Sequence, residues 1–157
     1  MEQKVEQKAE PKNKMSLEFE SRACNESFAR VSVAAFLAQL NPTMEEVADV
    51  KTAVSEAITN AIIHAYDSQV KKIRLDCELE GNVIRVCVTD YGKGIEDVEK
   101  AMEPMYTTRP DLERSGMGFS FMEAFMDRLE VDSTPGHGTV VRMEKCIGRA
   151  SGPEEDR

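Results

Sequence analysis

The sequence has few cysteines and no long hydrophobic run. No stretch approaches the roughly 20 apolar residues that span a bilayer, so we expect no membrane segment and no membrane partner. The N-terminus mixes both charges and lacks the apolar core of a signal peptide. The cysteines form no C-x-x-C pair, which disfavours a zinc site or a disulfide framework: Cys24, Cys77, Cys87 and Cys146. These absences predict a cytoplasmic protein.

A cluster of basic residues is also missing. The 157-residue chain has a net charge of −9, and its lysines and arginines form no stripe. Repulsion by phosphates therefore disfavours direct binding to DNA or RNA. The hydrophobic content of 41% and charged content of 31% are ordinary for one soluble globular domain.

The common nucleotide-binding signatures are absent as well. The sequence contains no G-x-x-x-x-G-K-[S/T] loop, and it lacks the H-R-D and D-F-G motifs of eukaryotic-type protein kinases. Any phosphoryl-transfer chemistry would need a different kind of site.

The ends of the chain have a composition that differs from its middle. Residues 1–14 are polar and charged, with one branched aliphatic side chain, and residues 149–157 are similarly polar. Such segments bury too little apolar surface to order themselves. We expect a disordered extension over 1–14, a domain over 15–148 and a flexible tail over 149–157.

Hydrophobic periodicity predicts helices in the first half of the domain. A short strand around Leu17 and Phe19 should precede a helix over 25–40, capped by Asn25. The apolar stripe of that helix should be Phe28, Val31 and Ala35. A capping box, Thr43-x-x-Glu46, predicts a second helix that ends near Tyr66.

Alternation dominates the second half. Apolar residues alternate with polar ones over 73–79 and 84–88, around a Gly-Asn turn. The stretch 90–118 reads as a functional loop with a short helix near 97–102, followed by a helix from Gly118 with Phe119, Met122, Phe125 and Leu129 inward. Strands from Val131 onward complete an α+β two-layer sandwich, with helices on one face of a mainly antiparallel sheet.

Glu56 and Asn60 are four residues apart, so they project from one side of the second helix. A carboxylate beside a carboxamide can act as a general base next to a Mg²⁺ ligand. An isolated E-x-x-x-N match is more often a solvated polar face. The pair carries weight only in combination with other motifs.

Three glycine-containing motifs follow in order. Asp90-Tyr-Gly92-Lys-Gly94 comes directly after a strand, where a carboxylate can accept a hydrogen bond from a base amine. Gly116-Met-Gly118 leads into a helix whose N-terminus can hold phosphates, and Gly136-His-Gly138-Thr139 precedes the final strand. Taken alone, the first and last motifs are more typical of tight turns, and a single G-x-G is common; the ordered series favours a nucleotide site.

This series resembles the boxes of the GHKL superfamily, which includes gyrase and histidine-kinase ATPase domains. Three longer stretches, 25–30, 60–66 and 107–118, are similar to the anti-sigma F factor family of endospore-forming bacteria. The resemblance covers about 15–145 and departs from the family at Ala65, where glycine is expected. It implies the Bergerat ATP-binding fold, with ATP or ADP and Mg²⁺ as cofactors.

The resemblance also implies roles for individual residues. Asn60 would bind Mg²⁺, Asp90 would read adenine, Glu56 would orient or deprotonate the acceptor serine, and Arg114 would neutralise the γ-phosphate. Arg30 would contact protein partners. The complete set of implied nucleotide contacts is Asn60, Asp90, Gly92, Gly94, Thr108, Ser115, Gly116, Met117, Gly118 and Thr139.

The implied function is that of a homodimeric serine-protein kinase that holds sigma factor F and phosphorylates an anti-anti-sigma factor. Two alternatives remain open at this point. The chain could serve a general stress sigma factor, or it could be an ATP-dependent binding module without kinase activity. We expect His64, at the end of its helix, to cap or pack that helix rather than accept a phosphate.

Overall fold

The computed structural model describes residues 12–67, 69–103 and 118–148. The predicted site residues Thr108, Arg114, Ser115, Gly116 and Met117 lie outside these ranges. In chain order the elements are β1 (Lys12–Glu20), α1 (Ala23–Leu37), η1 (Ala38–Leu40), α2 (Met44–Asn60), η2 (Ala61–Ala65), β2 (Lys72–Glu80), β3 (Val83–Asp90), α3 (Val98–Ala101), α4 (Gly118–Phe125), β4 (Arg128–Thr134) and β5 (Gly138–Cys146).

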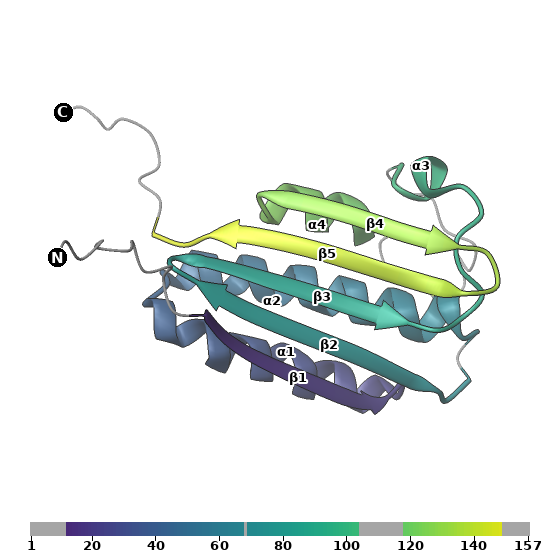
Figure 1. Ribbon diagram of the computed structural model, residues 1–157, viewed down its shortest axis with the longest axis horizontal. Helices are drawn as coiled ribbons and strands as arrows, with labels where there is room; N and C mark the ends of the chain where they lie inside the picture. Colours follow the sequence, from purple (N-terminus) through teal and green to yellow (C-terminus); the bar gives the residue numbers. More distant parts are fainter. Residues whose placement is uncertain (1–11, 68, 104–117, 149–157) are drawn as a thin grey trace, which may run out of the picture.

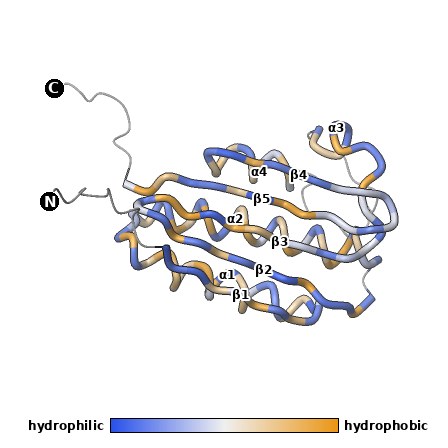
Figure 2. The backbone as a smooth tube through the Cα atoms, in the orientation of Figure 1, coloured by the Kyte–Doolittle hydropathy of each residue, from blue (hydrophilic) through white to orange (hydrophobic). Residues whose placement is uncertain are grey.

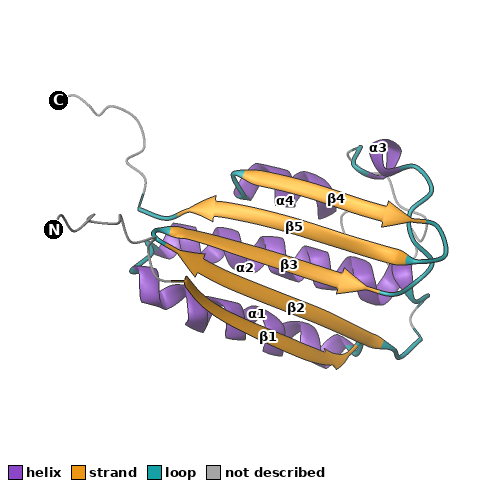
Figure 3. Cartoon of the chain, viewed as in Figure 1, coloured by secondary structure: helices purple, strands orange, loops and turns teal. Residues whose placement is uncertain are grey.

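The five strands form one sheet in the order β1-β2-β3-β5-β4, and every neighbouring pair is antiparallel. The helices α1, α2 and α4 lie together on one face of this sheet (Figures 1 and 3). The predicted α+β two-layer sandwich is therefore confirmed. Among the described helices, none is both long and apolar enough to cross a membrane.

Strict alternation in β2 and β3 explains why the helices cover one face only. Ile73, Leu75, Cys77 and Leu79 are buried against the helices, while the residues between them are half-buried or exposed on the other face. β3 repeats the pattern. The alternation of hydrophilic and hydrophobic segments along these strands is visible in Figure 2, and it matches a sheet with one face on the core and one in water.

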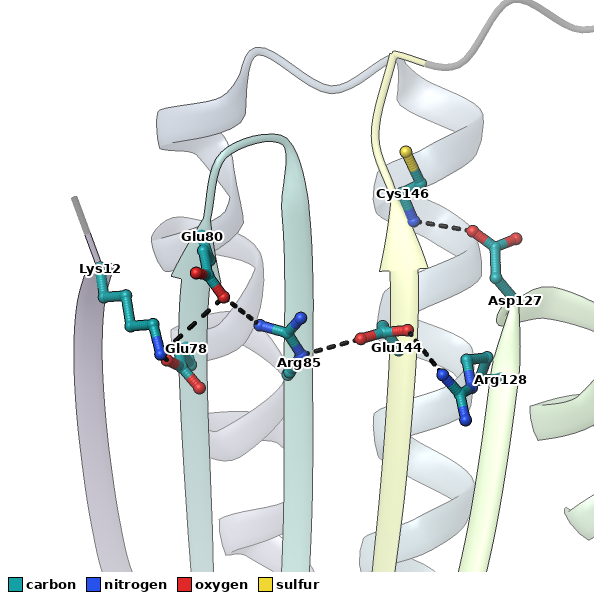
Figure 4. A network of polar contacts seen from close by, with 8 residues as sticks. All are labelled: Lys12, Glu78, Glu80, Arg85, Asp127, Arg128, Glu144 and Cys146. Carbon is teal, nitrogen blue, oxygen red and sulfur yellow. Dashed lines mark hydrogen bonds and ion pairs between the residues drawn. The ribbon is translucent and has the colours of Figure 1, made fainter. Parts of the chain in front are cut away.

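The face that the helices leave open carries ion pairs between strands. The Arg85 guanidinium lies 2.9 Å from Glu80 and 2.8 Å from Glu144, and Lys12 lies 3.4 Å from Glu78 (Figure 4). Cross-strand pairs of opposite charge suit a hydrated surface. Because Arg85 is well exposed, each such pair stabilises the fold by less than about 1 kcal/mol.

The start of α2 confirms the predicted capping box. Thr43 Oγ1 accepts from the Glu46 N–H at 3.1 Å, and Glu46 Oε1 accepts from the Thr43 N–H at 2.9 Å. Reciprocal bonds of this kind satisfy two donors that a helix start leaves unpaired. The buried stripe of α2 is formed by Val50, Ala53, Val54, Ala57 and Ile58.

The first helix differs from the prediction in its buried face. α1 buries Ala29, Val33 and Leu37, whereas Phe28 and Val31 are 53% and 55% exposed. The helix carries two apolar stripes, and periodicity alone cannot choose between them. The stripe that begins with the small Ala29 packs against the core.

The boundaries of α1 also differ. The N-cap position of α1 is Arg22, whose side chain makes no capping hydrogen bond, and the Asn25 side chain donates to the Glu20 carbonyl at 2.9 Å. α1 ends at Leu37, where a 3-10 turn continues to Leu40.

Two other boundaries were misplaced by the sequence. β1 is longer than the short strand predicted around Leu17 and Phe19 and begins at Lys12, because backbone pairing with β2 continues to Lys12 opposite Glu80. α4 begins at Gly118 as predicted but ends at Phe125, so Leu129 lies in β4. The remaining division into extension, domain and tail stays a prediction.

Candidate functional site

A cavity of about 540 Å³ opens at the end of the sheet where β3 ends and β5 begins. Its walls come from α2, η2, the segment after β3, α3, α4 and the turn before β5. α3 lies at this end of the sheet (Figure 1). The lining residues are Ala57, Asn60, Ala61, His64, Ala65, Val88, Asp90, Lys93, Gly94, Ile95, Glu96, Asp97, Lys100, Ala101, Glu103, Gly118, Phe119, Pro135, Thr139 and Val141.

Five of the predicted nucleotide residues line this one cavity although they come from four separate segments. They are Asn60, Asp90, Gly94, Gly118 and Thr139. Glu56 and Gly92 stand next to it, in contact with lining residues. The structure thus brings the described residues of all four motifs to one place, and their roles in binding a nucleotide stay predictions.

Gly118 brings the start of α4 against the Glu56/Asn60 pair. A Cβ atom built on Gly118 would lie 3.3 Å from both amide atoms of Asn60 and 3.3 Å from Glu56 Oε1. The first turn of a helix presents unpaired N–H groups and the positive end of its dipole. A carboxylate, a carboxamide and the first described residue of α4 thus meet at one point, a combination that suits a site for phosphates.

The helix that carries Asn60 ends in a π-helical turn. Residues Ala61–Ala65 form this turn directly after α2, and such turns are frequent at functional sites. Three small side chains, Ala57, Ala61 and Ala65, line the cavity on this side. Their short methyl groups leave room for a flat apolar group beside them.

Asp90 is a buried carboxylate at the end of β3. It is 7% exposed, and burial raises the pKa of its carboxyl group above the ordinary value, while N–H donors from Gly92 and Thr139 oppose that shift. Its Oδ1 atom accepts from the Gly92 N–H at 3.0 Å. A carboxylate has about four acceptor positions, so Asp90 has capacity for a donor in the cavity.

The segment after Asp90 is held by a series of backbone donations. Four N–H groups within five residues have fixed acceptors: Tyr91 donates to the Tyr66 hydroxyl (2.7 Å), Gly92 to Asp90 Oδ1 (3.0 Å), Lys93 to the Ala65 carbonyl (3.1 Å) and Ile95 to Ser133 Oγ (2.7 Å). Fixed donors of this kind keep a loop in one conformation. The cavity floor is therefore built in advance of any ligand.

Two glycines in this segment have no room for a side chain. A Cβ atom on Gly92 would overlap the Ala65 carbonyl, and one on Gly94 would overlap the Thr134 carbonyl. Gly94 also has a φ of +78°, a conformation that side chains disfavour. The D-x-G-x-G spacing is thus required by close backbone packing on both sides of the segment.

Thr139 lies opposite Asp90 on β5. Its side chain is 6% exposed, and its hydroxyl lies 2.7 Å from Ser133 Oγ, which also accepts from Ile95. Ser133 therefore connects Thr139 of the Gly136–Thr139 motif with Ile95, which directly follows the Asp90–Gly94 motif. Sequence analysis missed Ser133, because its partners are 6 and 38 residues away.

Charged side chains of both signs line the mouth of the cavity. Lys93 and Lys100 are the basic ones, and Lys93 also lies 3.4 Å from Asp67. His64 lines the cavity too, although we expected it to cap or pack the helix end. The signal was present, since Glu56, Asn60 and His64 repeat every four residues along one helix side.

Arg30 lies on α1 and does not line the cavity. Its guanidinium donates to Glu26 at 3.0 Å and to Ser27 at 3.0 Å. Its predicted role in partner binding stays a prediction. Within the described ranges, no group of three or more His, Cys, Asp or Glu side chains is placed to hold a metal ion.

Comparison with known proteins agrees with this geometry. The histidine kinase-like ATPase domain family matches residues 19–145. An anti-sigma F factor of Caldanaerobacter subterraneus is 61% identical over 137 residues, which cover 87% of this chain and 96% of that protein. An anti-sigma F factor of Thermoanaerobacter sp. is 60% identical over 136 residues, covering 87% and 95%, and one of Pasteuria penetrans is 57% identical over 138 residues, covering 87% and 92%.

Solved structures share the fold at lower identity. The RsbU and RsbW domains of a Mycobacterium tuberculosis protein superpose with a TM-score of 0.63 at 19% identity, covering 86% of this chain and 32% of that one. A blue-light activated histidine kinase domain of Erythrobacter litoralis gives a TM-score of 0.50 at 18% identity, covering 78% and 61%. At these identities the likeness concerns the fold alone.

Proposed function

Because the chain belongs to the histidine kinase-like ATPase domain family and, within it, to the anti-sigma F factors, we propose that it is an ATP-dependent serine-protein kinase that binds and inhibits sigma factor F. Its phosphorylation substrate would be a serine of an anti-anti-sigma factor. The observation that carries the proposal is that Asn60, Gly118 and the buried Asp90 line one cavity, with Glu56 against the start of α4 beside it.

The end of the cavity at Asp90 suits an adenine base. The Asp90 carboxylate can accept a hydrogen bond from the exocyclic amine, which guanine lacks at that position. The Thr139 hydroxyl, oriented by Ser133, offers a second polar contact. The methyl groups of Ala57 and Ala61 supply apolar surface for the ring.

The end of the cavity at Asn60 suits the phosphates. Asn60 Oδ1 is a hard oxygen donor of the kind that Mg²⁺ takes, and Mg²⁺ in nucleotide sites commonly uses one or two protein ligands with phosphates and waters. Bound Mg²⁺ would neutralise charge on the transferred phosphoryl group. The start of α4 at Gly118 would place N–H donors near the phosphate oxygens, together with Gly116.

Glu56 is the residue that we assign to the acceptor serine. Its carboxylate stands beside Asn60 and at the start of α4, so a serine presented there would be oriented or deprotonated next to the phosphate. Arg114 is our candidate for the cation at the γ-phosphate. Lys93 and Lys100, which line the cavity mouth, can contribute to the same electrostatic field.

Partner binding is assigned to the exposed side of α1. Arg30 would contact both sigma factor F and the anti-anti-sigma factor, and overlapping sites would make release a competition. The protein would act as a homodimer in the cytoplasm. With a net charge of −9, it would act on transcription through its protein partners rather than through DNA or RNA.

The proposal is tested by incubating the purified chain with labelled ATP, Mg²⁺ and the anti-anti-sigma factor. We expect phosphoserine on that factor with the wild type and less than about 1% of that rate with Glu56→Gln, since loss of a general base costs roughly 10²–10⁴-fold. Glu45→Gln is the matched control, because Glu45 lies exposed in the first turn of α2. Unchanged transfer by Glu56→Gln would contradict the assignment.

The same assay separates the proposal from a binding module without chemistry. For a kinase, the release of sigma factor F should differ between ATP and a non-hydrolysable analogue, because only ATP allows phosphoryl transfer. Identical release in both, with no phosphoserine, would support the binding module instead.

A further inference from the structure

The hydroxyl group of Tyr66 joins two strands at the edge of the cavity. Tyr66 is 3% exposed and follows the π-helical turn. Its hydroxyl donates to the Lys72 carbonyl at 2.5 Å and accepts from the Tyr91 N–H at 2.7 Å. One side-chain group therefore connects the residue at the start of β2 with the residue that follows Asp90.

The bridge lies where the next residue pair of the β2–β3 ladder would form. The paired residues end at Ile73 and Asp90, and in the same register Lys72 would face Tyr91. A direct bond between the Lys72 carbonyl and the Tyr91 N–H would continue the sheet. The Tyr66 hydroxyl bonds both of these groups at the step where the paired residues end, directly beside Asp90.

The hydroxyl is suited to this bridging role. Burial raises the pKa of the Tyr66 hydroxyl above its ordinary value, so the group keeps its proton at neutral pH and can donate and accept at once. The chain segment that follows Tyr66 is itself fixed by hydrogen bonds. The Tyr66 carbonyl accepts from Gln69 at 2.8 Å, and Ser21 Oγ bonds both the Gln69 carbonyl (2.9 Å) and the Lys71 N–H (2.8 Å).

From this geometry we infer that Tyr66 is a positioning residue for base selection: its hydroxyl ties the start of β2 to Tyr91 and thereby sets where the neighbouring Asp90 carboxylate lies in the cavity. The inference rests on the proposed function, in which Asp90 accepts a hydrogen bond from the adenine amine. Tyr66 does not line the cavity itself, so it acts through Tyr91 and Asp90.

Removal of the hydroxyl has two possible structural consequences, and both displace Asp90. The Lys72 carbonyl and Tyr91 N–H can lose this partner, which leaves two partly buried polar groups without the bond that the hydroxyl makes to each. Alternatively they can close on each other and continue the ladder, which draws Tyr91 toward β2. In either case the carboxylate loses the position that matches the base amine.

The test compares two ligands on wild type and on Tyr66→Phe. The ligands are Mg·ATP and the Mg complex of purine riboside triphosphate, which has the same sugar and phosphates without the 6-amino group. For Tyr66→Phe we expect the dissociation constant for ATP to rise about tenfold and that for the analogue to change less than about twofold. At saturating ATP the phosphorylation rate should stay within about twofold, so that the effect falls on KM.

Ile84→Val is the matched control for a general loss of stability. Ile84 is fully buried near the opposite end of β3, and the loss of one methylene destabilises without touching the cavity. It should leave the ratio of the two dissociation constants unchanged. A wild-type chain that binds no ATP would refute the proposed function, whereas the outcomes that follow concern Tyr66 alone.

The inference is overturned if Tyr66→Phe binds ATP as wild type does, or if it loses both ligands equally. A measurement on the unmodified chain gives an independent check should the variant fold poorly. In amide hydrogen exchange of the wild type, ATP should slow exchange of the Tyr91 N–H several-fold more than the analogue does. Equal protection by both ligands would likewise overturn the inference.

Discussion

Replacement of Asp90 by Asn should change which purine the cavity prefers. The Gly92 N–H, 3.0 Å from Asp90 Oδ1, fixes an oxygen at that position in the wild type, and it should do the same for the new amide. The amide NH₂ group would then face the cavity. In place of an acceptor for the adenine amine, the Asp90→Asn variant presents a donor.

The size of the effect follows from the bond that is lost. A hydrogen bond to a buried carboxylate contributes about 1.5–3 kcal/mol, and two donors that face each other add the cost of an unsatisfied group. Loss of the bond alone should lower ATP affinity roughly 10- to 150-fold, and the unsatisfied group adds to that loss. GTP, whose ring carries a carbonyl oxygen where adenine has its amine, should lose nothing or bind more tightly.

Calorimetric titration of the wild type and of Asp90→Asn with Mg·ATP and Mg·GTP measures the ratio of the ATP and GTP affinities directly. Thermal unfolding without nucleotide is the control, and its midpoint should stay within a few degrees, since shape and the Gly92 acceptor are retained. An unchanged ATP:GTP ratio would refute the reasoning that Asp90 reads the base. A fall of both affinities by the same factor would refute it as well.

Three further predictions follow from the same geometry. Gly118→Ala should lower the phosphorylation rate at least about tenfold while the chain stays folded, because the new methyl group would lie 3.3 Å from Asn60 and Glu56; unchanged turnover would show that this contact does not matter. ATP affinity should fall as pH drops through the raised pKa of Asp90, because the protonated carboxyl group loses acceptor capacity. The stability of the nucleotide-free fold should change in the opposite sense: the contribution of Asp90 to the free energy of unfolding is present in full below the ordinary pKa and is lost as pH rises through the raised pKa. Titrations and urea unfolding over that pH range check both signs, and a flat profile in Asp90→Asn is the control. Thr43→Ala should lower the free energy of unfolding by about 1 kcal/mol through loss of the capping box without a change in ATP affinity; an altered affinity would show that the start of α2 is coupled to the cavity.

Local sequence signals predicted the parts of the fold that depend on neighbours in the chain. The capping box at Thr43 gave the start of α2, and alternation gave β2 and β3 with their buried faces. Alternation succeeds because side chains in a strand point to opposite faces in turn. In the site, the four motifs were found because each is local, and the structure brings the described ones into one cavity.

The predictions were wrong where contacts between residues far apart in the sequence determine the structure. α1 has two apolar stripes, and only packing against the core selects Ala29, Val33 and Leu37 over the stripe with Phe28. β1 extends to Lys12 because β2 continues beside it, which composition cannot indicate.

The supporting residues of the site were missed for the same reason. Ser133 bonds Ile95 across 38 residues, and Tyr66 bonds Tyr91 across 25. Neither bond leaves a spacing signal in the sequence. Such residues become visible only once the fold has placed the segments side by side.

The central claim is that one cavity holds a metal nucleotide with its base at Asp90 and its phosphates at Asn60. A crystal structure of the full chain with ATP and Mn²⁺, whose anomalous scattering locates the metal, tests it most directly. We predict the adenine amine within hydrogen-bond distance of the Asp90 carboxylate and the metal on Asn60 Oδ1, at the roughly 2.1 Å of octahedral oxygen ligands. A nucleotide bound elsewhere, or a metal without contact to Asn60, would contradict the account.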